Sequence, residues 1–315
     1  MVEQLPKAVS WDQVIEAFLF SRRAAGVSKG MLDQYSARLR IFRDFHLQRI
    51  LPCGSPLECT PQCIEAFFVY LQENGRRMIT VLGYYRILRV FFRWLKNIGL
   101  RQDYPLSLVK PPKPENPLPR TITEDHFLAV IKQLNPSKPL DLRYAALFTL
   151  LFDTGARISE ILQLRVGDID LKNRLIRIRG KGNKERIIPF GRTAATLLSR
   201  HLSLLATQKT LTNDDLVFQS SNFTPLHRRN VYRRWQQLQK KIGLNPLPLH
   251  GLRHGFARAW LISGGDAFSL QLILGHASPE TTKRYVTLWA SDLQQKHAQH
   301  SPVDRLTLMG KIKER

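Results

Sequence analysis

The chain has 315 residues, and its 48 lysines and arginines against 25 acidic residues give a formal net charge of +23 at pH 7. A positive excess of this size predicts a polyanionic partner, either nucleic acid or an anionic membrane surface. Hydrophobic residues make up 43 % of the chain, which excludes a chain that is disordered throughout. The sequence has no apolar run of about 18 residues that could cross a membrane and no secretory signal at its N-terminus. We therefore expect a soluble, cytoplasmic protein that binds nucleic acid.

Three cysteines, Cys53, Cys59 and Cys63, lie within one short segment. An odd number of cysteines in a chain without a secretory signal argues against a disulfide framework. Their spacings, with five and three intervening residues, match no standard zinc site. We expect reduced cysteines and no bound metal, with a structural metal ion as the minor alternative.

The first hundred residues predict a helical domain. Ser10 and Gln13 form a capping box before an apolar stripe. Thr60 followed by Pro61 has the pattern of an N-cap and a first helical position. Apolar residues at helical spacing predict two further helices, over 31–47 and from Thr80 onward.

Three arginines share one face of the last of these helices. Arg86, Arg89 and Arg93 are spaced by three and four residues, which places them together on a helix surface. Such a face is either an ordinary solvated surface or a set of contacts to nucleic-acid phosphates. The net charge of the chain keeps both alternatives open.

A proline-rich segment follows the helical domain. Six of the 18 prolines lie between Arg101 and Arg120, and this density excludes a helix or a central strand. We expect a semi-rigid, extended linker over 101–120. The chain then divides into a helical domain over 1–100 and a second domain over 121–315.

The second domain is predicted to be mainly helical. Thr123 and Asp141 have the character of N-caps for helices over 124–134 and 142–153. A further helix is expected over 156–164, after a glycine-containing turn.

A change of period then predicts a small antiparallel sheet. Residues 175–179 and 186–190 alternate or carry β-branched side chains, with a turn between them that contains glycine and asparagine. Helices return after Thr224, beginning with a strongly basic segment. Its candidate contacts to phosphate are Arg228, Arg229, Arg233 and Arg234.

Two segments of this domain carry candidate functional side chains. Arg157 opens a predicted helix, and Glu160 lies three residues later on the same face. The pair is either an ordinary ion pair on a helix surface or a functional arginine that Glu160 orients through a charge-assisted hydrogen bond. Lys181 lies in the hairpin turn, where it is either solvated or able to reach into a cleft and give up a proton.

Histidines gather in the last third of the chain. If the segment after His250 is a helix, Arg253 lies one turn later, and both side chains can face one cleft. His254 follows Arg253 directly and is expected to point elsewhere, into the fold. His276 and Tyr285 belong to two further predicted helix starts. Any one of these histidines alone is more often a structural residue than a catalytic one.

Five motifs occur together in this half of the chain: TGARISEIL, GKGNKERIIP, HGLRHGFA, LGHAS and TTKRY. In their order and spacing the chain resembles the tyrosine recombinases, the phage integrase family, and most closely its Xer-like branch. The resemblance covers nearly the whole chain. It implies a helical core-binding domain with a SAM-like fold, followed by an α+β catalytic domain. It also implies six catalytic residues: Arg157, Lys181, His250, Arg253, His276 and Tyr285.

The reaction implied by the resemblance takes place at a DNA phosphodiester. Tyr285 would attack phosphorus and form a 3′-phosphotyrosyl link while a 5′-hydroxyl leaves. His250 could accept the phenol proton, and Lys181 would protonate the leaving oxygen. A covalent intermediate splits the reaction into two exchanges of similar energy.

Charge that develops on the phosphate needs fixed cationic donors. Arg157 and Arg253 can bind nonbridging oxygens through paired hydrogen bonds and stay charged at any physiological pH. His276 would hydrogen-bond another nonbridging oxygen. The sequence has no phosphate-binding loop for ATP and no clustered carboxylates for two metal ions, so we expect no cofactor.

The partner expected from the resemblance is double-stranded DNA, bound by a tetramer on two paired sites or together with a second recombinase. Two other functions stay open. A type IB-like topoisomerase would nick and reseal one duplex with similar groups, and a DNA-binding regulator would have lost catalysis. The N-terminal helical module favours recombination, and the complete set of six residues argues against the regulator.

Overall fold

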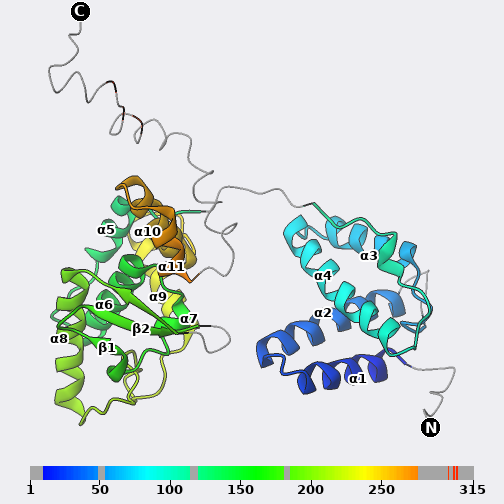
Figure 1. The fold of residues 1–315 in the computed structure, drawn as a ribbon, viewed down its shortest axis with the longest axis horizontal. Helices are drawn as coiled ribbons and strands as arrows, with labels where there is room; N and C mark the ends of the chain where they lie inside the picture. The colour runs from blue at the N-terminus through cyan, green and yellow to red at the C-terminus, as the bar shows by residue number, and fades with distance from the viewer. Residues whose placement is uncertain are drawn as a thin grey trace, which may run out of the picture. The chain divides into compact units, whose positions relative to one another are not determined.

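The computed structural model describes residues 10–48, 54–113, 120–180 and 185–275, together with His297, Ser301 and Val303. The chain forms two compact units, Met1–Pro117 and Leu118–Arg315 (Figure 1). The described residues are mostly helical, with one small antiparallel sheet in the second unit, so the predicted fold class is confirmed. Within these ranges no helix is both long enough and apolar enough to span a membrane.

The described part of the first unit contains the four predicted helices, whose expected caps are also present. The hydroxyl of Ser10 accepts a hydrogen bond from the backbone of Gln13, and the Gln13 side chain accepts one from the backbone of Ser10 at 3.0 Å. Thr60 caps the third helix. The helices are α1 (Trp11–Ala24), α2 (Lys29–Gln48), α3 (Pro61–Glu73) and α4 (Met78–Asn97).

Aromatic rings fill the core of this unit. Phe91 of α4 packs edge-to-face against Phe18 of α1 with ring centroids 5.3 Å apart. Phe42 of α2 meets Phe67 of α3 in the same way at 4.9 Å. All four rings are fully buried, and edge-to-face pairs add to the stabilisation from burial alone. This packing fixes α4 with its arginine-bearing side toward solvent.

The first part of the predicted linker packs onto the first unit. A short 3-10 helix spans Pro105–Ser107, and Leu106 and Val109 belong to the core of the unit. The buried Arg101 donates to the carbonyl of Pro56 at 2.7 Å and pairs with Asp103. Two apolar side chains and a buried guanidinium therefore hold this stretch in place, although its prolines predict an extended chain.

Two of the three cysteines lie at the start of α3. Cys59 and Cys63 are buried, and the hydroxyl of Thr60 donates to the Cys63 sulfur at 3.3 Å. They pack as small apolar residues in the core of the first unit. Cys53 lies outside the described residues.

The second unit is built around α6 (Pro139–Thr154), whose side chains are buried on nearly every side. Two helices, α8 (Arg192–Gln208) and α10 (His250–Ile262), pack against it. Of these helices, α8 was not predicted from the sequence. The other described helices are α5 (Glu124–Ile131), α7 (Ile158–Ile161), α9 (Arg228–Lys241) and α11 (Ala267–Leu274).

Two helix boundaries differ from the prediction. Thr123 caps α5 as expected, but α6 begins earlier, at Pro139, with Lys138 in the N-cap position. The fixed φ of a proline suits the first helical position, so Asp141 lies within the first turn. There Asp141 accepts from the backbone of Asn135 at 3.2 Å and is not an N-cap.

The helix expected over 156–164 is only one turn long. Gly155 adopts a left-handed conformation with φ 61° and ends α6, and α7 then spans Ile158–Ile161. Beyond it, the carbonyl of Leu164 accepts from the backbone N–H of Val217 at 2.9 Å. This pairing with a distant segment draws the chain out of the helix.

The sheet has the order β1–β2–β3, and all of its pairs are antiparallel. Its strands are β1 (Ile169–Asp170), β2 (Leu175–Arg179) and β3 (Glu185–Pro189), so the predicted hairpin is confirmed. Ile176 pairs with Ile188, and Ile178 pairs with Arg186. The three isoleucines are buried in the core of the second unit, so Arg186 lies on the inward face of its strand.

A buried histidine of α8 predicts acid sensitivity of the second unit. His201 is 1 % exposed, donates from Nε2 to the carbonyl of Val217 at 3.0 Å, and has its pKa lowered to about 4 by burial. An unfolded histidine has a pKa of about 6.5, so the unfolded chain binds an extra proton as the pH falls from 6.5 to 4. Stability is therefore lost in that window, by about 3 kcal/mol at pH 4.

Urea unfolding of the full chain at pH 7 and at pH 4 measures this loss. His201→Gln keeps a donor near the Val217 carbonyl and cannot titrate. We expect the variant to lose about 3 kcal/mol less than the wild type between the two pH values. Equal losses in both proteins would refute the assignment.

Candidate active site

Arg157 and Glu160 are joined by two hydrogen bonds at the start of α7. The backbone N–H of Arg157 donates to Glu160 Oε2 at 2.8 Å, and its guanidinium Nη1 donates to Oε1 at 2.9 Å. The Arg157 side chain is 42 % exposed, whereas that of Glu160 is 6 % exposed. The predicted hydrogen bond is therefore present, and it holds a solvent-accessible guanidinium on a buried carboxylate.

A second arginine, which was not predicted as a site residue, binds the same carboxylate. Arg186 of β3 donates from Nη1 to Glu160 Oε1 at 3.1 Å and from Nη2 to Oε2 at 2.8 Å. Burial alone would raise the pKa of Glu160, but the hydrogen bonds from Arg186 and from Arg157 lower it below its usual value. The carboxylate therefore stays ionised between two cations.

A signal for this contact exists in the sequence. In the strand pattern of ERIIP, Arg186 shares a face with Ile188, which is the core-facing side of the predicted hairpin. A buried arginine needs an acidic partner, and Glu160 is an acid on a predicted helix of the same domain. The pairing itself cannot be read from local spacing.

Arg253 is the most deeply buried of the predicted catalytic arginines, at 3 % exposed. Its Nη1 donates to the carbonyl of Gly155 at 2.8 Å, and its Nη2 donates to the carbonyl of Leu274 at 2.8 Å. Because two backbone segments fix the plane of this guanidinium, its orientation is set before any ligand binds.

His250 is the first residue of α10, one turn before Arg253. Desolvation lowers the pKa of His250, and the charges of Arg253, Arg157 and Arg228 lower it further. The imidazole is therefore mostly neutral at pH 7 and able to accept a proton. The three arginines that act on His250 come from α10, from α9 and from the N-cap of α7.

His254 differs from its expected position. The residue lies one turn after His250, and the two rings meet edge-to-face with centroids 4.6 Å apart. His254 is half-buried and lies beside His250. Residues four apart on a helix share a face, which explains the contact.

Three of the six predicted catalytic residues, Lys181, His276 and Tyr285, lie outside the described residues. Lys181 comes two positions after the last residue of β2. His276 comes directly after Gly275, the C-cap of α11. Arg186 contacts both preceding elements, since it pairs with Ile178 of β2 and donates to the carbonyl of Ile273 in α11.

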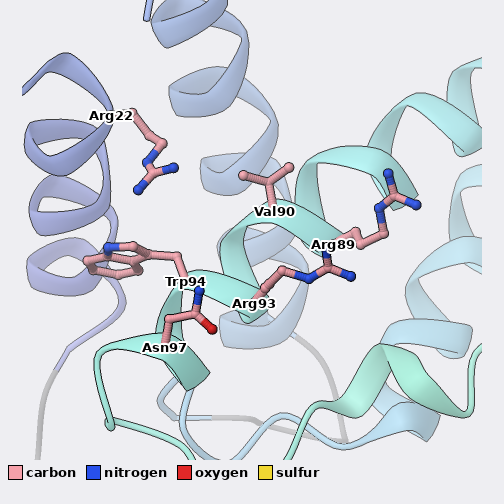
Figure 2. Close-up of a pocket in the computed structure, with 6 residues that line it drawn as sticks. All are labelled: Arg22, Arg89, Val90, Arg93, Trp94 and Asn97. Carbon is pink, nitrogen blue, oxygen red and sulfur yellow. The ribbon is translucent and has the colours of Figure 1, made fainter. Parts of the chain in front are cut away.

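The predicted basic face of the first unit is solvent-exposed at Arg86, Arg89 and Arg93. Two of these arginines line a surface pocket. Its lining consists of Arg22 from α1 with Arg89, Val90, Arg93, Trp94 and Asn97 from α4 (Figure 2). Three guanidinium groups beside an indole ring have the chemistry of a phosphate-contacting surface, so the pocket adds Arg22 to the predicted face.

The basic segment of α9 divides into two kinds of arginine. Arg234 donates to Asp141 at 2.7 Å, lies over the ring of Tyr144, and is half-buried. This guanidinium is engaged within the second unit, which argues against the phosphate contact expected for it. The other three members of the predicted set, Arg228, Arg229 and Arg233, are exposed.

Comparison with known proteins gives concordant results. Residues 120–291 match the family model of the phage integrase family. The tyrosine recombinase XerD of Listeria monocytogenes serotype 4b (strain F2365) is 30 % identical over 296 residues, which cover 92 % of this chain and 99 % of the relative. XerD of Yersinia pestis is 31 % identical over 252 residues, covering 78 % and 83 % of the two chains.

Among solved structures, the XerH site-specific recombinase bound to its difH substrate in a pre-cleavage complex is 25 % identical to this chain. The match has a TM-score of 0.68 and covers 89 % of this chain and 82 % of XerH. The chain therefore belongs to the phage integrase family and is a tyrosine recombinase of the Xer-like branch, a site-specific DNA recombinase that cleaves DNA with a tyrosine.

Proposed function

We propose that Tyr285 is the nucleophile of this recombinase and that Arg157, Lys181, His250, Arg253 and His276 complete its active site. The observation that carries the proposal is the convergence at His250. The charges of Arg157 and Arg253, which come from distant parts of the sequence, both act on that imidazole. Such a cluster of cations around a neutral base suits an anionic substrate.

The first step exchanges one phosphodiester bond for another. The phenol oxygen of Tyr285 attacks phosphorus, and its proton passes to His250. The bond between phosphorus and the 5′-oxygen breaks, and that oxygen takes a proton from Lys181. The products are a 3′-phosphotyrosyl link and a free 5′-hydroxyl, so no bond energy is lost and the reverse step can rejoin a strand.

The two arginines contribute differently to this step. Arg157 presents an accessible guanidinium that Glu160 tethers, whereas Arg253 is held rigidly by two carbonyls. Together they aim cationic donors at the nonbridging oxygens, where charge develops in the transition state. His276 adds a further hydrogen bond to the same phosphate.

DNA binding is proposed to involve the exposed arginines of both units. XerH, the solved relative described above, is bound to difH DNA, and this supports a duplex as the substrate here. In the first unit the contacts come from Arg86, Arg89 and Arg93, with the half-buried Arg22 beside them. In the second unit they come from Arg228, Arg229 and Arg233. Exchange between two duplexes requires active subunits on each, so we propose a tetramer on two paired sites, formed by this chain alone or with a second recombinase.

Trapping the covalent adduct in the native host and sequencing the attached DNA tests this function. We expect one short sequence to be recovered repeatedly, linked through its 3′-phosphate. Recovery of tight binding sites without any adduct would support a regulator that has lost catalysis. Adducts spread over unrelated sequences, together with relaxation of supercoiled DNA by a monomer, would support a topoisomerase.

The pH dependence of cleavage tests the role of His250. The base must be neutral, so kcat/KM falls as the pH drops through the pKa of His250, which lies below the ordinary value in the free protein. Arg228→Gln removes a cation that lowers this pKa. In this variant we therefore expect the acid limb of the plot of kcat/KM against pH to move to higher pH.

Arg229→Gln is the matched control, because Arg229 is the next residue of α9 and is also exposed. Its substitution should weaken DNA binding without moving the acid limb. An unmoved limb in Arg228→Gln, or equal shifts in both variants, would show that His250 is not the titrating group.

A further inference from the structure

Arg186 connects three separate segments of the second unit. Its side chain is 15 % exposed, and each of its three guanidinium nitrogens donates a hydrogen bond. Nη1 and Nη2 bind the two oxygens of Glu160, and Nε donates to the carbonyl of Ile273 at 2.9 Å. Paired bonds of this kind fix direction as well as distance.

The shared carboxylate makes Arg157 dependent on Arg186. Both oxygens of Glu160 accept one hydrogen bond from each arginine. Among the described residues, Glu160 is the acid that holds the half-exposed Arg157 guanidinium. Without Arg186, this carboxylate would lose two of its four bonds and could rotate or move with Arg157 attached.

The third contact lies at the end of α11. The carbonyl of Ile273 accepts from Arg186, and the carbonyl of Leu274 accepts from Arg253. Two cations therefore bind the C-terminal carbonyls, where the helix dipole favours positive charge. A Cβ added at Gly275 would lie 3.0 Å from the guanidinium of Arg186, so Arg186 also packs closely on the residue that precedes His276.

We propose that Arg186 is a positioning residue of the active site, which orients Arg157 through Glu160 and holds the end of α11 ahead of His276. This inference rests on the proposed function, because it assigns Arg186 a role through Arg157. Arg186 contacts no reacting atom in this account. It also fixes β3 and therefore one end of the hairpin that carries Lys181.

The test measures adduct formation by the full-length protein. Duplexes are selected from a random pool by binding to the wild type, and a nick beside the cleavage position traps the adduct. The single-turnover rate at saturating protein and the protein concentration for half-saturation are measured separately. Thermal unfolding of each variant is recorded alongside.

We expect Arg186→Gln to slow adduct formation by about 10–100-fold, by analogy with residues that orient the ligands of a metal ion. The half-saturating concentration should change by less than about twofold, since the exposed DNA contacts remain. Arg186→Lys keeps the charge but not the paired geometry. Its rate of adduct formation should lie between those of the wild type and Arg186→Gln. The matched control is Arg179→Gln, in the neighbouring strand of the hairpin, where Arg179 pairs with the exposed Glu185; it should retain the wild-type rate.

A double-mutant cycle separates positioning from general stability. In an Arg157→Gln background, Arg186→Gln should slow adduct formation by a clearly smaller factor than in the wild type, because Arg157, one of the groups it positions, is gone. If Arg186 had a purely structural role, its substitution would slow adduct formation by the same factor in both backgrounds. That result would overturn the inference. So would a wild-type rate in Arg186→Gln. If Arg186→Gln does not fold, the same cycle with Arg186→Lys decides.

Failure of the proposed function looks different. The wild type itself would then form no adduct on any selected duplex, whatever the state of Arg186. A different outcome is an adduct in the wild type together with the same fold-loss from Arg186→Gln in both backgrounds. That outcome would leave the proposed function intact and remove only the role assigned to Arg186.

Discussion

Replacing Tyr285 with phenylalanine is expected to abolish the covalent adduct between protein and DNA. The substitution removes only the phenol oxygen, which is the atom proposed to bond to phosphorus. A neighbouring side chain is not expected to take over the reaction, because attack at phosphorus needs a nucleophile that is aligned with the phosphate. Adduct formation is measured on nicked duplexes by a shift in denaturing gels.

DNA binding by Tyr285→Phe should stay within about twofold of the wild type, since the basic surfaces are untouched. The matched control is Tyr232→Phe, because Tyr232 is an exposed tyrosine of α9 whose hydroxyl accepts a bond from Gln236. That variant should form the adduct normally. Persistent adduct in Tyr285→Phe would mean that another residue is the nucleophile.

The second large effect is expected for Arg157→Gln, which should lower the single-turnover cleavage rate by ~10²–10³, as for loss of one donor to a developing oxyanion. The loss should appear in the rate at saturating protein, because this contact strengthens as charge develops in the transition state. The Arg157 side chain is 42 % exposed, so the free energy of unfolding should change little.

Arg165 offers an unusually close control for this experiment. Like Arg157, it is an N-cap residue, here of the 3-10 helix Val166–Asp168, and its backbone N–H donates to an acid three residues later, Asp168. Its side chain is 43 % exposed, which matches Arg157. We expect Arg165→Gln to cleave at the wild-type rate, and equal losses in the two variants would show that Arg157 acts only through local structure.

Local patterns in the sequence were sufficient for several parts of the site. The spacing of His250 and Arg253 places both on one turn of α10, and the spacing of Arg157 and Glu160 predicts their hydrogen bond. Such pairs are determined by helix geometry over three or four residues. The caps of α1, α3 and α5 were predictable for the same reason.

Contacts between residues far apart in the sequence could not be predicted from these local patterns. Arg186 and Glu160 are 26 positions apart, and Arg234 and Asp141 are 93 apart. An arginine in a basic run is predicted to face solvent, yet Arg234 folds back because Asp141 lies at the facing turn of α6. The early end of α7 also depends on a distant partner, since Val217 pairs with Leu164.

The helix α8 could have been predicted but was missed. Ala194, Leu198, His201 and Leu205 are its buried residues, and their spacing of four, three and four positions is that of an amphipathic helix. A histidine within that stripe weakens the apolar signal. Its burial against the Val217 carbonyl and the ring of Phe218 becomes clear only in the folded unit.

The three arginines of the site have different contacts and different exposure. Arg253 and Arg186 are mostly buried and bind the last carbonyls of α11, while Arg157 keeps an accessible guanidinium. Arg186 therefore connects Glu160 with the end of α11, whereas Arg253 connects the end of α11 with the carbonyl of Gly155. Arg157 and Arg253 are the two arginines proposed to bind the phosphate, and Arg157 is held by Glu160.

Mass mapping of the DNA-linked peptide is the most direct measurement of the central claim. The adduct is formed in EDTA on a nicked duplex, digested with protease and nuclease, and sequenced by tandem mass spectrometry. The account predicts a nucleotide attached through a phosphate to the phenol oxygen of Tyr285. A nucleotide on any other residue, or no linked peptide under conditions where the DNA is cut, would contradict it.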